Sequence, residues 1–569
     1  MAKFDDACRR IIDKAKAAGL KDLDELNKLK LKVIKELNEK KLPSNIDLAM
    51  HASKQELKSL RHLLGIKPTR IASGVAVCAI MTKPFKCPHG RCSYCPGGIG
   101  SFFGSTPQSY TGHEPAALRA KRNDFDAYLQ VFNRLEQYIA MNKPVEKIEL
   151  IVMGGTFPAM PEAYQESFIQ YSFKALNDFG EFFYSKNNFD LAKFKEFFEL
   201  PGSIHDIERA KRIKAKLLKL KSRHSRTLAL EQKRNEQAHA RNVALCIESR
   251  PDYCRQKHIT RLLGFGATRV ELGVQSIYDS VLERVARGHS VNDSIKATQL
   301  LKDSFLKVSY HSMPGLPGSS KEKDINMFKE FFSNPDFMPD ALKIYPCMVL
   351  EGTKLFNEWK KSSFKPLTTK QAVDIIVASK QFIPKWCRVM RIQRDIPSKH
   401  TVAGPDRTNL RQLVHAELER KGIKCNCIRC REPKTKPISF DDLKLSTETY
   451  DASNGVEAFI SFEDKKTDSL LGFCRLRMPF KPFLKEITKG SAGIRELHVY
   501  GSAMPLGEIR FEGIQHKGIG KALLAEAERL AVEEFDAKKL LVLSGIGARQ
   551  YYSKLGYKKN CFFMQKLFN

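Results

Sequence analysis

Apolar residues follow three successive patterns along the chain. Over residues 1–70 they recur at helical spacing, as at Leu26 and Leu29, which predicts amphipathic helices. Residues 71–400 contain short apolar runs that end at glycine or polar residues and alternate with helical stretches. From about residue 441 the runs are typical of a β-meander followed by a helix. Together these patterns predict an α/β multidomain protein.

The middle region has the pattern of a parallel β/α barrel. Its strands end at polar or glycine residues, which is where such barrels place their chemistry. Six strands are fewer than the eight of a closed barrel, so an open barrel is expected. The predicted strands are 71–81, 148–153, 244–247, 269–274, 308–313 and 341–346.

A loop after the first strand carries Cys87, Cys92 and Cys95, spaced C-x4-C-x2-C. Prolines and glycines keep this loop out of regular structure, so three thiolates can surround a compact group. Cysteine thiolates hold iron–sulfur clusters. Three ligands leave one iron of a [4Fe-4S] cluster open, which is the working part of radical S-adenosylmethionine (SAM) chemistry. A zinc loop is the alternative, but zinc usually takes four ligands in paired spacing, and no fourth lies nearby.

A second cysteine group lies in a predicted linker, 401–440. Cys425, Cys427 and Cys430 form a C-x-C-x2-C cluster that is too dense for chance, and zinc is its natural ligand. Bound zinc would rigidify the linker and contribute folding energy. The identity of the fourth ligand stays open among His400, His415, Cys387 and Asp406.

The C-terminal region, 441–569, contains a predicted anion site at the start of a helix. A glycine-containing stretch from Gln515 to Gly520 opens this helix, where free backbone N–H groups and the helix dipole favour an anion. A strand and then a helix bearing Tyr551 and Tyr552 follow. In this order, the glycine loop, helix, strand and tyrosine pair predict a pyrophosphate-binding site. The strands expected around it are 458–462, 469–476, 494–500 and 540–544.

The charge of the chain points to its partner. Its 569 residues carry a formal net charge of +32, which predicts a polyanionic partner and favours nucleic acid over membrane. No apolar run approaches the roughly 18 residues of a spanning helix. A basic insertion at 206–241 is expected to be a phosphate-contacting arm, with an ordinary solvated surface as the alternative. Clustered cysteines without a signal peptide indicate a reducing, cytoplasmic setting.

Several motifs together resemble the catalytic subunit of Elongator. They include the cysteine loop, the segments at 154–158 and 248–252, Leu342-Lys-Ile-Tyr-Pro, and Arg495-Glu-Leu-His-Val-Tyr-Gly. The resemblance implies a radical-SAM domain joined to an acetyltransferase domain of the GNAT type. It also implies modification of the wobble uridine of transfer RNA (tRNA). The implied units are a helical tRNA-binding segment (1–70), the open barrel (71–400), the zinc linker (401–440) and the GNAT domain (441–569).

The resemblance also implies roles for individual residues. Cys87, Cys92 and Cys95 match the cluster ligands, and Lys343 matches a lysine near the radical site. Tyr551 and Tyr552 match a tyrosine pair at acetyl-CoA and, with Lys343, are the expected catalytic residues, although at most one tyrosine is expected to face the ligand. The remaining cofactor positions are Gly154, Gly155, Thr156 and Gln275 for SAM, and Gln515, His516, Lys517, Gly518, Ile519 and Gly520 for coenzyme A.

The implied reaction begins with cleavage of SAM by an electron from the cluster. The resulting radical takes a hydrogen from the acetyl methyl group, the carbon radical adds to uridine carbon 5, and thioester hydrolysis leaves 5-carboxymethyluridine. The two domains are therefore expected to face each other across one cleft, with the target base flipped out. Two alternatives are a protein lysine acetyltransferase with a structural cluster and a non-catalytic tRNA-binding scaffold. The substrate tRNAs, the electron donor, self-association and Elongator-type partners are not specified by the sequence.

Overall fold

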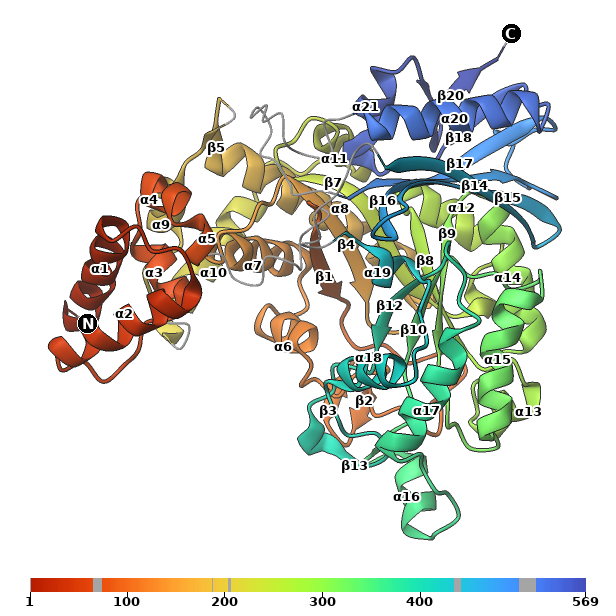
Figure 1. The fold of residues 1–569 in the computed structure, drawn as a ribbon, viewed down its shortest axis with the longest axis horizontal. Helices are drawn as coiled ribbons and strands as arrows, with labels where there is room; N and C mark the ends of the chain where they lie inside the picture. Colours follow the sequence, from red (N-terminus) through yellow and green to blue (C-terminus); the bar gives the residue numbers. More distant parts are fainter. Residues whose placement is uncertain are drawn as a thin grey trace.

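The computed structural model describes residues 2–64, 74–186, 188–202, 206–433, 442–500 and 518–568. It contains a helical segment, an open parallel sheet covered by helices, and a second mixed sheet (Figure 1). The predicted boundaries near 70 and 440 lie outside the described residues. Within the described ranges, no helix has the length and apolarity needed to cross a bilayer.

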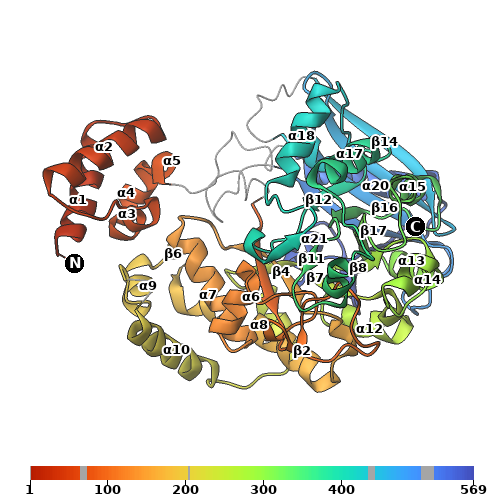
Figure 2. The same cartoon turned by 90° about the horizontal axis from the view of Figure 1, so that it is seen from below.

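The N-terminal segment forms a small helical unit with its own hydrophobic cluster. Ser44 and Ser53 cap two of its helices. Each serine hydroxyl accepts from the backbone N–H of the residue three positions later, and the carboxylate of that residue accepts from the backbone N–H of the serine. The unit lies beside α9 (Leu191–Phe197), where Lys195 Nζ donates to the carbonyl of Ala52 at 2.8 Å (Figure 2). Its helices are α1 (Ala2–Ala17), α2 (Leu23–Glu36), α3 (Asn45–His51), α4 (Lys54–Ser59) and α5 (Arg61–Leu64).

The central sheet has seven parallel strands in the order β1-β4-β7-β8-β9-β10-β12. β1 and β12 form its edges, so the barrel is open, as predicted. The seventh strand, β12, was absent from the prediction because its five residues include two arginines. The strands are β1 (Ala76–Met81), β4 (Lys147–Met153), β7 (Arg241–Ser249), β8 (Arg269–Gln275), β9 (Lys307–Ser312), β10 (Ala341–Ile344) and β12 (Arg388–Ile392).

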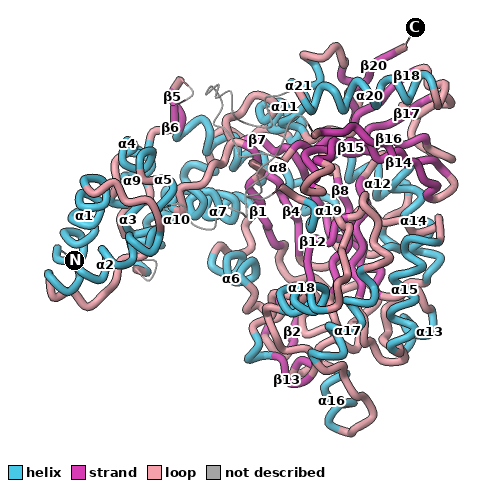
Figure 3. The backbone as a smooth tube through the Cα atoms, in the orientation of Figure 1, coloured by secondary structure: helices cyan, strands magenta, loops and turns pink. Residues whose placement is uncertain are grey.

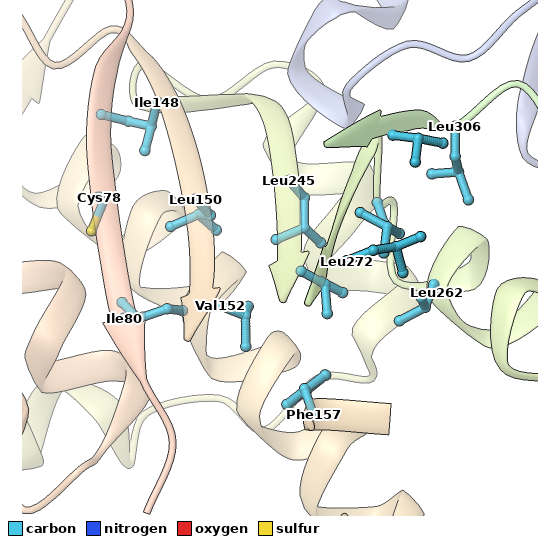
Figure 4. Close-up of a cluster of buried hydrophobic side chains, with 14 of the residues drawn as sticks. Cys78, Ile80, Ile148, Leu150, Val152, Phe157, Leu245, Leu262, Leu272 and Leu306 are labelled. Carbon is cyan, nitrogen blue, oxygen red and sulfur yellow. The ribbon is translucent and has the colours of Figure 1, made fainter. Parts of the chain in front are cut away.

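One face of this sheet is apolar and packs on helices. Ile148, Leu150 and Val152 of β4 lie with Leu245 and Leu272 in the main hydrophobic core (Figure 4). The helices of this region are α6 (Pro115–Arg122), α7 (Ala127–Ala140), α8 (Glu162–Phe183), α12 (Gln256–Gly264), α13 (Asp279–Arg284), α14 (Val291–Asp303), α15 (Lys321–Ser333), α16 (Lys354–Lys360), α17 (Thr369–Lys380), α18 (Leu410–Arg420) and α19 (Ile428–Arg431), of which α16 lies beyond the end of the sheet (Figure 1). Short strand pairs are β2–β3 (Gly98–Ser101, Gly104–Thr106), β5–β6 (Tyr184–Ser185, Asn188–Phe189) and β11–β13 (Val349–Leu350, Thr401–Ala403).

The basic insertion is helical. It forms α10 (Ile207–Lys221) and α11 (Leu228–Asn235), and Ile213, Leu217 and Leu220 bury one face of α10. Several of its basic side chains are neutralised within the chain. These pairs are Arg209–Glu136, Lys211–Glu208, Arg212–Glu199, Lys214–Asp124, Lys216–Glu199 and Lys221–Asp126.

The C-terminal sheet has the order β14-β15-β16-β17-β18-β20-β19. Strands β17 and β18 pair in parallel only from Ser491 to Ile494 of β17, so the rest of β17 diverges from β18. The sheet adds β14, β19 and β20 to the predicted strands. Its elements are β14 (Leu443–Ala452), β15 (Gly455–Asp464), β16 (Ser469–Met478), β17 (Ser491–Val499), α20 (Ile519–Glu533), β18 (Lys539–Val542), α21 (Arg549–Ser553), β19 (Lys558–Asn560) and β20 (Phe563–Leu567).

The second sheet covers the amino-terminal ends of the barrel strands (Figures 1 and 3). Its buried Arg495 donates to Asp340, which immediately precedes β10, and to the carbonyl of Leu306, which precedes β9. Lys307, the first residue of β9, pairs with Glu496 of β17 at 3.1 Å. The cysteine loop follows the carboxyl end of β1, at the opposite end of the barrel. The second sheet therefore meets the barrel at the end opposite the cysteine loop, and the expectation that both domains face one shared cleft stays a prediction.

Candidate functional site

The cysteine loop is held at the carboxyl end of the barrel with hydrogen-bond donors around its sulfurs. Cys92 and Cys95 are each 5% exposed. The Ser109 N–H donates to Cys95 Sγ at 3.3 Å, and Arg287 donates to Cys92 Sγ at 3.7 Å. Burial raises the pKa of Cys87 to about 11, with a contribution from the Cys95 thiolate. The Cys87 thiol therefore needs a nearby positive charge for ionisation, which bound iron would supply.

The spacing of these sulfurs favours a cluster over a single ion. Among the described residues, two groups of three or more metal-ligating atoms lie within 4.8 Å of one another, and the cysteine loop is in neither. A single tetrahedral ion needs its ligands at that short range, since zinc–sulfur bonds are about 2.3 Å long. An iron–sulfur cluster is larger and accepts more widely spaced thiolates. Three cysteine thiols in one loop, with hydrogen-bond donors at Cys92 and Cys95, are a donor set that fits a cluster.

The ends of β4 and β8 provide open backbone and free polar atoms beside this loop. Gly154 has φ +120°, and a Cβ there would lie 2.3 Å from Thr82 Oγ1, so only glycine fits. Gly155 follows with φ +105°, and the next residue, Thr156, is buried. Gln275 ends β8 with φ +69°, and its Oε1 is buried without a hydrogen-bond partner in the described part of the chain. An unpartnered buried acceptor on strained backbone fits a site for a polar cofactor.

The inner face of the sheet carries a buried charged cluster near the same end. Glu271 is fully buried and accepts from Lys343 and from His311, whose Nε2 lies 3.0 Å away. Lys343 also lies 3.6 Å from Glu248, which accepts from the Tyr110 hydroxyl at 3.1 Å. Although burial opposes the charge, the carboxylate of Glu271 keeps the pKa of Lys343 above its ordinary value. Lys343 is therefore a fixed ammonium group inside the barrel.

A further set of charges continues along this inner face toward the second sheet. Arg269 pairs with Glu271 at 3.2 Å and with Glu149 at 2.6 Å. Sequence reasoning assigned no role to Glu149, Arg269, Glu271 or His311. The signal was present, because charged residues alternate with apolar ones within β4, β8, β9 and β10. Such alternation in a helix-covered strand places charge on its other face.

The predicted coenzyme A site lies at the start of α20. Gly518 has φ +81° and begins the helix with no side-chain cap, so its first N–H groups are available to an anion. The Tyr551 hydroxyl lies 3.2 Å from where a Cβ of Gly520 would be. Tyr551 is 38% exposed, whereas Tyr552 is 6% exposed and packs in the core of the sheet. Of the predicted loop, Gln515, His516 and Lys517 lie outside the described residues.

Two titratable side chains of β17 lie against the barrel. Glu496 pairs with Arg475 at 3.0 Å as well as with Lys307. Although burial opposes ionisation, these cations lower the pKa of Glu496 to about 2. Burial lowers the pKa of His498 to about 4, and its Nε2 has no hydrogen-bond partner among the described residues. A carboxylate and a neutral imidazole therefore lie at the end of the barrel that meets the second sheet.

The three sulfurs of the second cysteine group, Cys425, Cys427 and Cys430, lie within 4.8 Å of one another. Lys380 Nζ lies 3.4 Å from Cys425 Sγ. None of the four candidates for a fourth ligand, His400, His415, Cys387 and Asp406, belongs to this group among the described residues. The Cys387 thiol is close enough to be affected, because burial and then the Cys427 thiolate raise the pKa of Cys387. The spacing fits a single metal ion with three thiolate ligands.

An open parallel barrel with this cysteine loop, joined to a sheet with diverging β17 and β18, defines a radical-SAM enzyme fused to a GNAT acetyltransferase. Family models agree. The Radical SAM superfamily matches residues 83–331, its C-terminal domain 339–420, the ELP3 N-terminal domain 4–72, and the acetyltransferase (GNAT) family 428–557.

Comparison with similar proteins identifies the family of the chain. It is 50% identical over 92% of its length to the "tRNA uridine(34) acetyltransferase" of Methanocaldococcus infernus, covering 91% of that protein. It is 37% identical over its full length to human "Elongator complex protein 3", covering 97% of it. The solved structure of the M. infernus Elp3 lacking residues 1–46 superposes with a TM-score of 0.70 at 44% identity, over 87% of this chain and all of that one. The chain therefore belongs to the Elongator complex protein 3 family.

Proposed function

We propose that this protein is a tRNA uridine(34) acetyltransferase that forms 5-carboxymethyluridine at the wobble position. The family supports this activity, since the M. infernus relative bears that name. The observation that carries it is the inner face of the barrel. Lys343 lies near the predicted cluster end, and Glu496 and His498 lie near the GNAT end. One substrate within the barrel could meet both chemistries.

The residues present fit the cofactors that the family implies. Cys87, Cys92 and Cys95 would hold a [4Fe-4S] cluster, and Gly154, Gly155, Thr156 and Gln275 would bind SAM beside it. The start of α20 and Tyr551 would bind acetyl-CoA, and Cys425, Cys427 and Cys430 would bind zinc. When bound, the reduced cluster and SAM supply the one-electron chemistry that activates the methyl carbon of the acetyl group.

Side chains of this protein would position the substrates and assist hydrolysis of the thioester. Lys343, fixed by Glu271, would donate hydrogen bonds to a carbonyl oxygen of uracil or of the thioester. His498 is neutral at physiological pH, so it can accept a proton from water as that water attacks the thioester carbonyl. The coenzyme A thiolate then leaves and takes up a proton, and a carboxymethyl group remains on the base.

The excess positive charge would bind the RNA. The N-terminal helices and α10 carry lysines and arginines that would contact phosphates, while contacts inside the barrel select uridine. The proposal also includes association with Elongator-type subunits or with a second copy of the chain. It further places the protein in the cytoplasm.

The decisive experiment combines anaerobically reconstituted, reduced protein with SAM, acetyl-CoA and tRNA, followed by mass spectrometry of the digested nucleosides. We expect 5-carboxymethyluridine from the native protein and none from Cys92→Ser, which should still bind tRNA. Absence of the product while both cofactors are bound would refute the proposal.

Acetylation of a lysine peptide that survives Cys87→Ser, Cys92→Ser and Cys95→Ser would instead indicate a protein acetyltransferase. Tight tRNA binding without RNA-stimulated acetyl-CoA hydrolysis would indicate a scaffold.

A further inference from the structure

Three aromatic side chains from distant parts of the chain meet near the cysteine end of the barrel. The rings of His113 and His400 stack with centroids 4.3 Å apart and an interplanar angle of 27°. Phe103 presents its edge to both, at 6.1 Å from His113 and 5.5 Å from His400. We call these three residues the aromatic platform. None of the three has a role in the proposed reaction.

The platform reaches the molecular surface. His113 is exposed, and Phe103 and His400 are only half-buried. The neighbouring Phe102 is 58% exposed, and its ring meets that of Phe103 edge-on at 5.1 Å. In addition, His400 Nε2 is shielded from solvent yet has no hydrogen-bond partner in the described ranges. Exposed rings beside an unpartnered polar atom fit a ligand that has both an apolar face and polar edges.

Two contacts connect the platform to the catalytic end of the barrel. The Ser109 N–H donates to Cys95 Sγ at 3.3 Å, and the Ser109 carbonyl accepts from Arg394. His113 lies four residues after Ser109, and His400 six residues after Arg394. Because short segments link each ring to this contact, the platform lies at the cysteine end of the barrel, the end from which we expect a base to reach Lys343.

The charges around the platform match a polyanion. Lys399 precedes His400 and is exposed, and Arg394 lies at the same edge of the barrel. Two carboxylates lie in the same segments. Glu114 interacts with His400, but it is buried and accepts from the N–H groups of Thr111 and Gly112. Asp395 is exposed, and its charge is balanced by Arg391 at 2.6 Å. Cations around exposed aromatic rings are the usual composition of a site for single-stranded nucleic acid.

We propose that the aromatic platform binds an unpaired nucleobase next to the target uridine by stacking on the exposed ring of His113. This inference rests on the proposed function, which brings an RNA loop to the barrel mouth. Extraction of one base from a loop breaks its stacking on the neighbours. A base held on His113, with its phosphates near Lys399 and Arg394, would replace part of that lost stacking and fix the register of the loop.

A double-mutant cycle between protein and RNA tests this stacking. The full-length protein is titrated with anticodon stem-loop RNAs in which each loop nucleotide in turn is replaced by an abasic one. We expect one abasic position other than the target to weaken binding about tenfold, the usual effect of one lost base–aromatic stack. His113→Ala should weaken binding of the intact loop to the same extent and cause no further loss with that abasic loop. His113→Tyr, which keeps an aromatic ring at this position, should restore binding of the intact loop.

The controls separate this inference from the catalytic proposal. Phe480→Ala removes an aromatic ring that is 56% exposed on the second domain and should leave binding of every RNA unchanged. Equal weakening of all RNAs by His113→Ala, or no weakening, would overturn the stacking proposal even if 5-carboxymethyluridine forms. Failure to form that product would refute the proposed reaction, whereas the binding cycle would still report on stacking.

Discussion

At the scale of single residues, the barrel interior is notable for how completely its charges are fixed. Lys343 is 11% exposed and lies between two carboxylates, Glu271 and Glu248, and Glu271 is in turn held by His311 and Arg269. An ammonium group with several fixed partners loses little freedom when substrate arrives. Such preorganisation is how a charged side chain contributes most to a reaction.

The adjacent tyrosines should respond differently to mutation. Tyr552→Ala removes a ring from the core of the second sheet and should lower the free energy of unfolding by about 3–5 kcal/mol. Tyr551→Phe removes only a hydroxyl beside Gly520 and should change stability by less than ~0.5 kcal/mol. It should lower tRNA-dependent acetyl-CoA hydrolysis about tenfold or more. Denaturant unfolding and a thiol-release assay measure the two effects, and equal stability losses would contradict the assignment.

His498 should titrate far below an ordinary histidine. Its folded pKa is about 4, so the unfolded chain binds this proton more tightly than the folded chain between about pH 4 and 6.5. The stability that its neutral form contributes is therefore complete above pH 6.5 and is lost as the pH falls toward 4. NMR titration of the imidazole resonances should give a midpoint near 4. A midpoint near 6.5, or an identical pH dependence of unfolding in His498→Gln, would contradict this.

At the scale of elements, α10 shows how charge is divided between folding and binding. Lys214 and Lys221 on this helix pair with Asp124 and Asp126. Lys219 of this helix, and Arg223 two residues beyond its end, are exposed and form no ion pair among the described residues. The paired side chains attach the helix to the barrel, and the unpaired ones remain available to a phosphate backbone.

This division predicts unequal effects on tRNA binding. Lys219→Gln combined with Arg223→Gln should weaken binding severalfold and reduce the salt dependence of affinity by about one to two counterions. Lys214→Gln with Lys221→Gln removes the same charge and should weaken binding less. Filter binding from about 50 to 200 mM salt distinguishes them. If both double variants had the same salt slope, α10 would not be a specific phosphate contact.

The elements themselves were largely predictable, and the reasons differ from one to another. Strand β4 was found because Ile148, Leu150 and Val152 are close in sequence, and the C-x4-C-x2-C loop because its ligands are local. Strand β12 was missed because two arginines interrupt its apolar pattern, so that only its pairing with β10, far away in the chain, identifies it. The pairing of Lys343 with Glu271 is likewise a contact over 72 residues. Long-range contacts decide which charged side chains meet, and local patterns do not record them.

At the scale of the whole molecule, a buried charged network joins the two domains. Asp340 before β10 pairs with Arg495 and with Arg475, at 3.6 Å, of the second sheet. Asp303 at the end of α14 receives two hydrogen bonds from Arg477. Since all these side chains are almost fully buried, the charges are compensated only when both domains are in place.

Breaking this network should be costly. Asp340→Asn leaves Arg495 and Arg475 buried with less opposite charge and should lower the free energy of unfolding by about 3–5 kcal/mol. Glu526→Gln removes one partner of the ion pair between Glu526 and Arg529 on the outer face of α20. It should change the free energy of unfolding by at most ~1 kcal/mol. Chemical denaturation followed by tryptophan fluorescence compares them, because Trp386 lies at this interface, where its carbonyl accepts from Arg475. Similar midpoints for both variants would show that the network does not hold the domains together.

The same arginines limit how far the acetyltransferase part can be regarded as a module. A domain that could be exchanged between proteins would present a surface compatible with water. Here the face of the second sheet that meets the barrel carries Arg475, Arg477 and Arg495, whose counter-charges include residues of the other domain. Separated from the barrel, the second sheet would expose this face to water, and its arginines would lose their carboxylate partners on the barrel. The two catalytic units therefore depend on each other for stability, and a change on one side of this contact constrains the residues on the other.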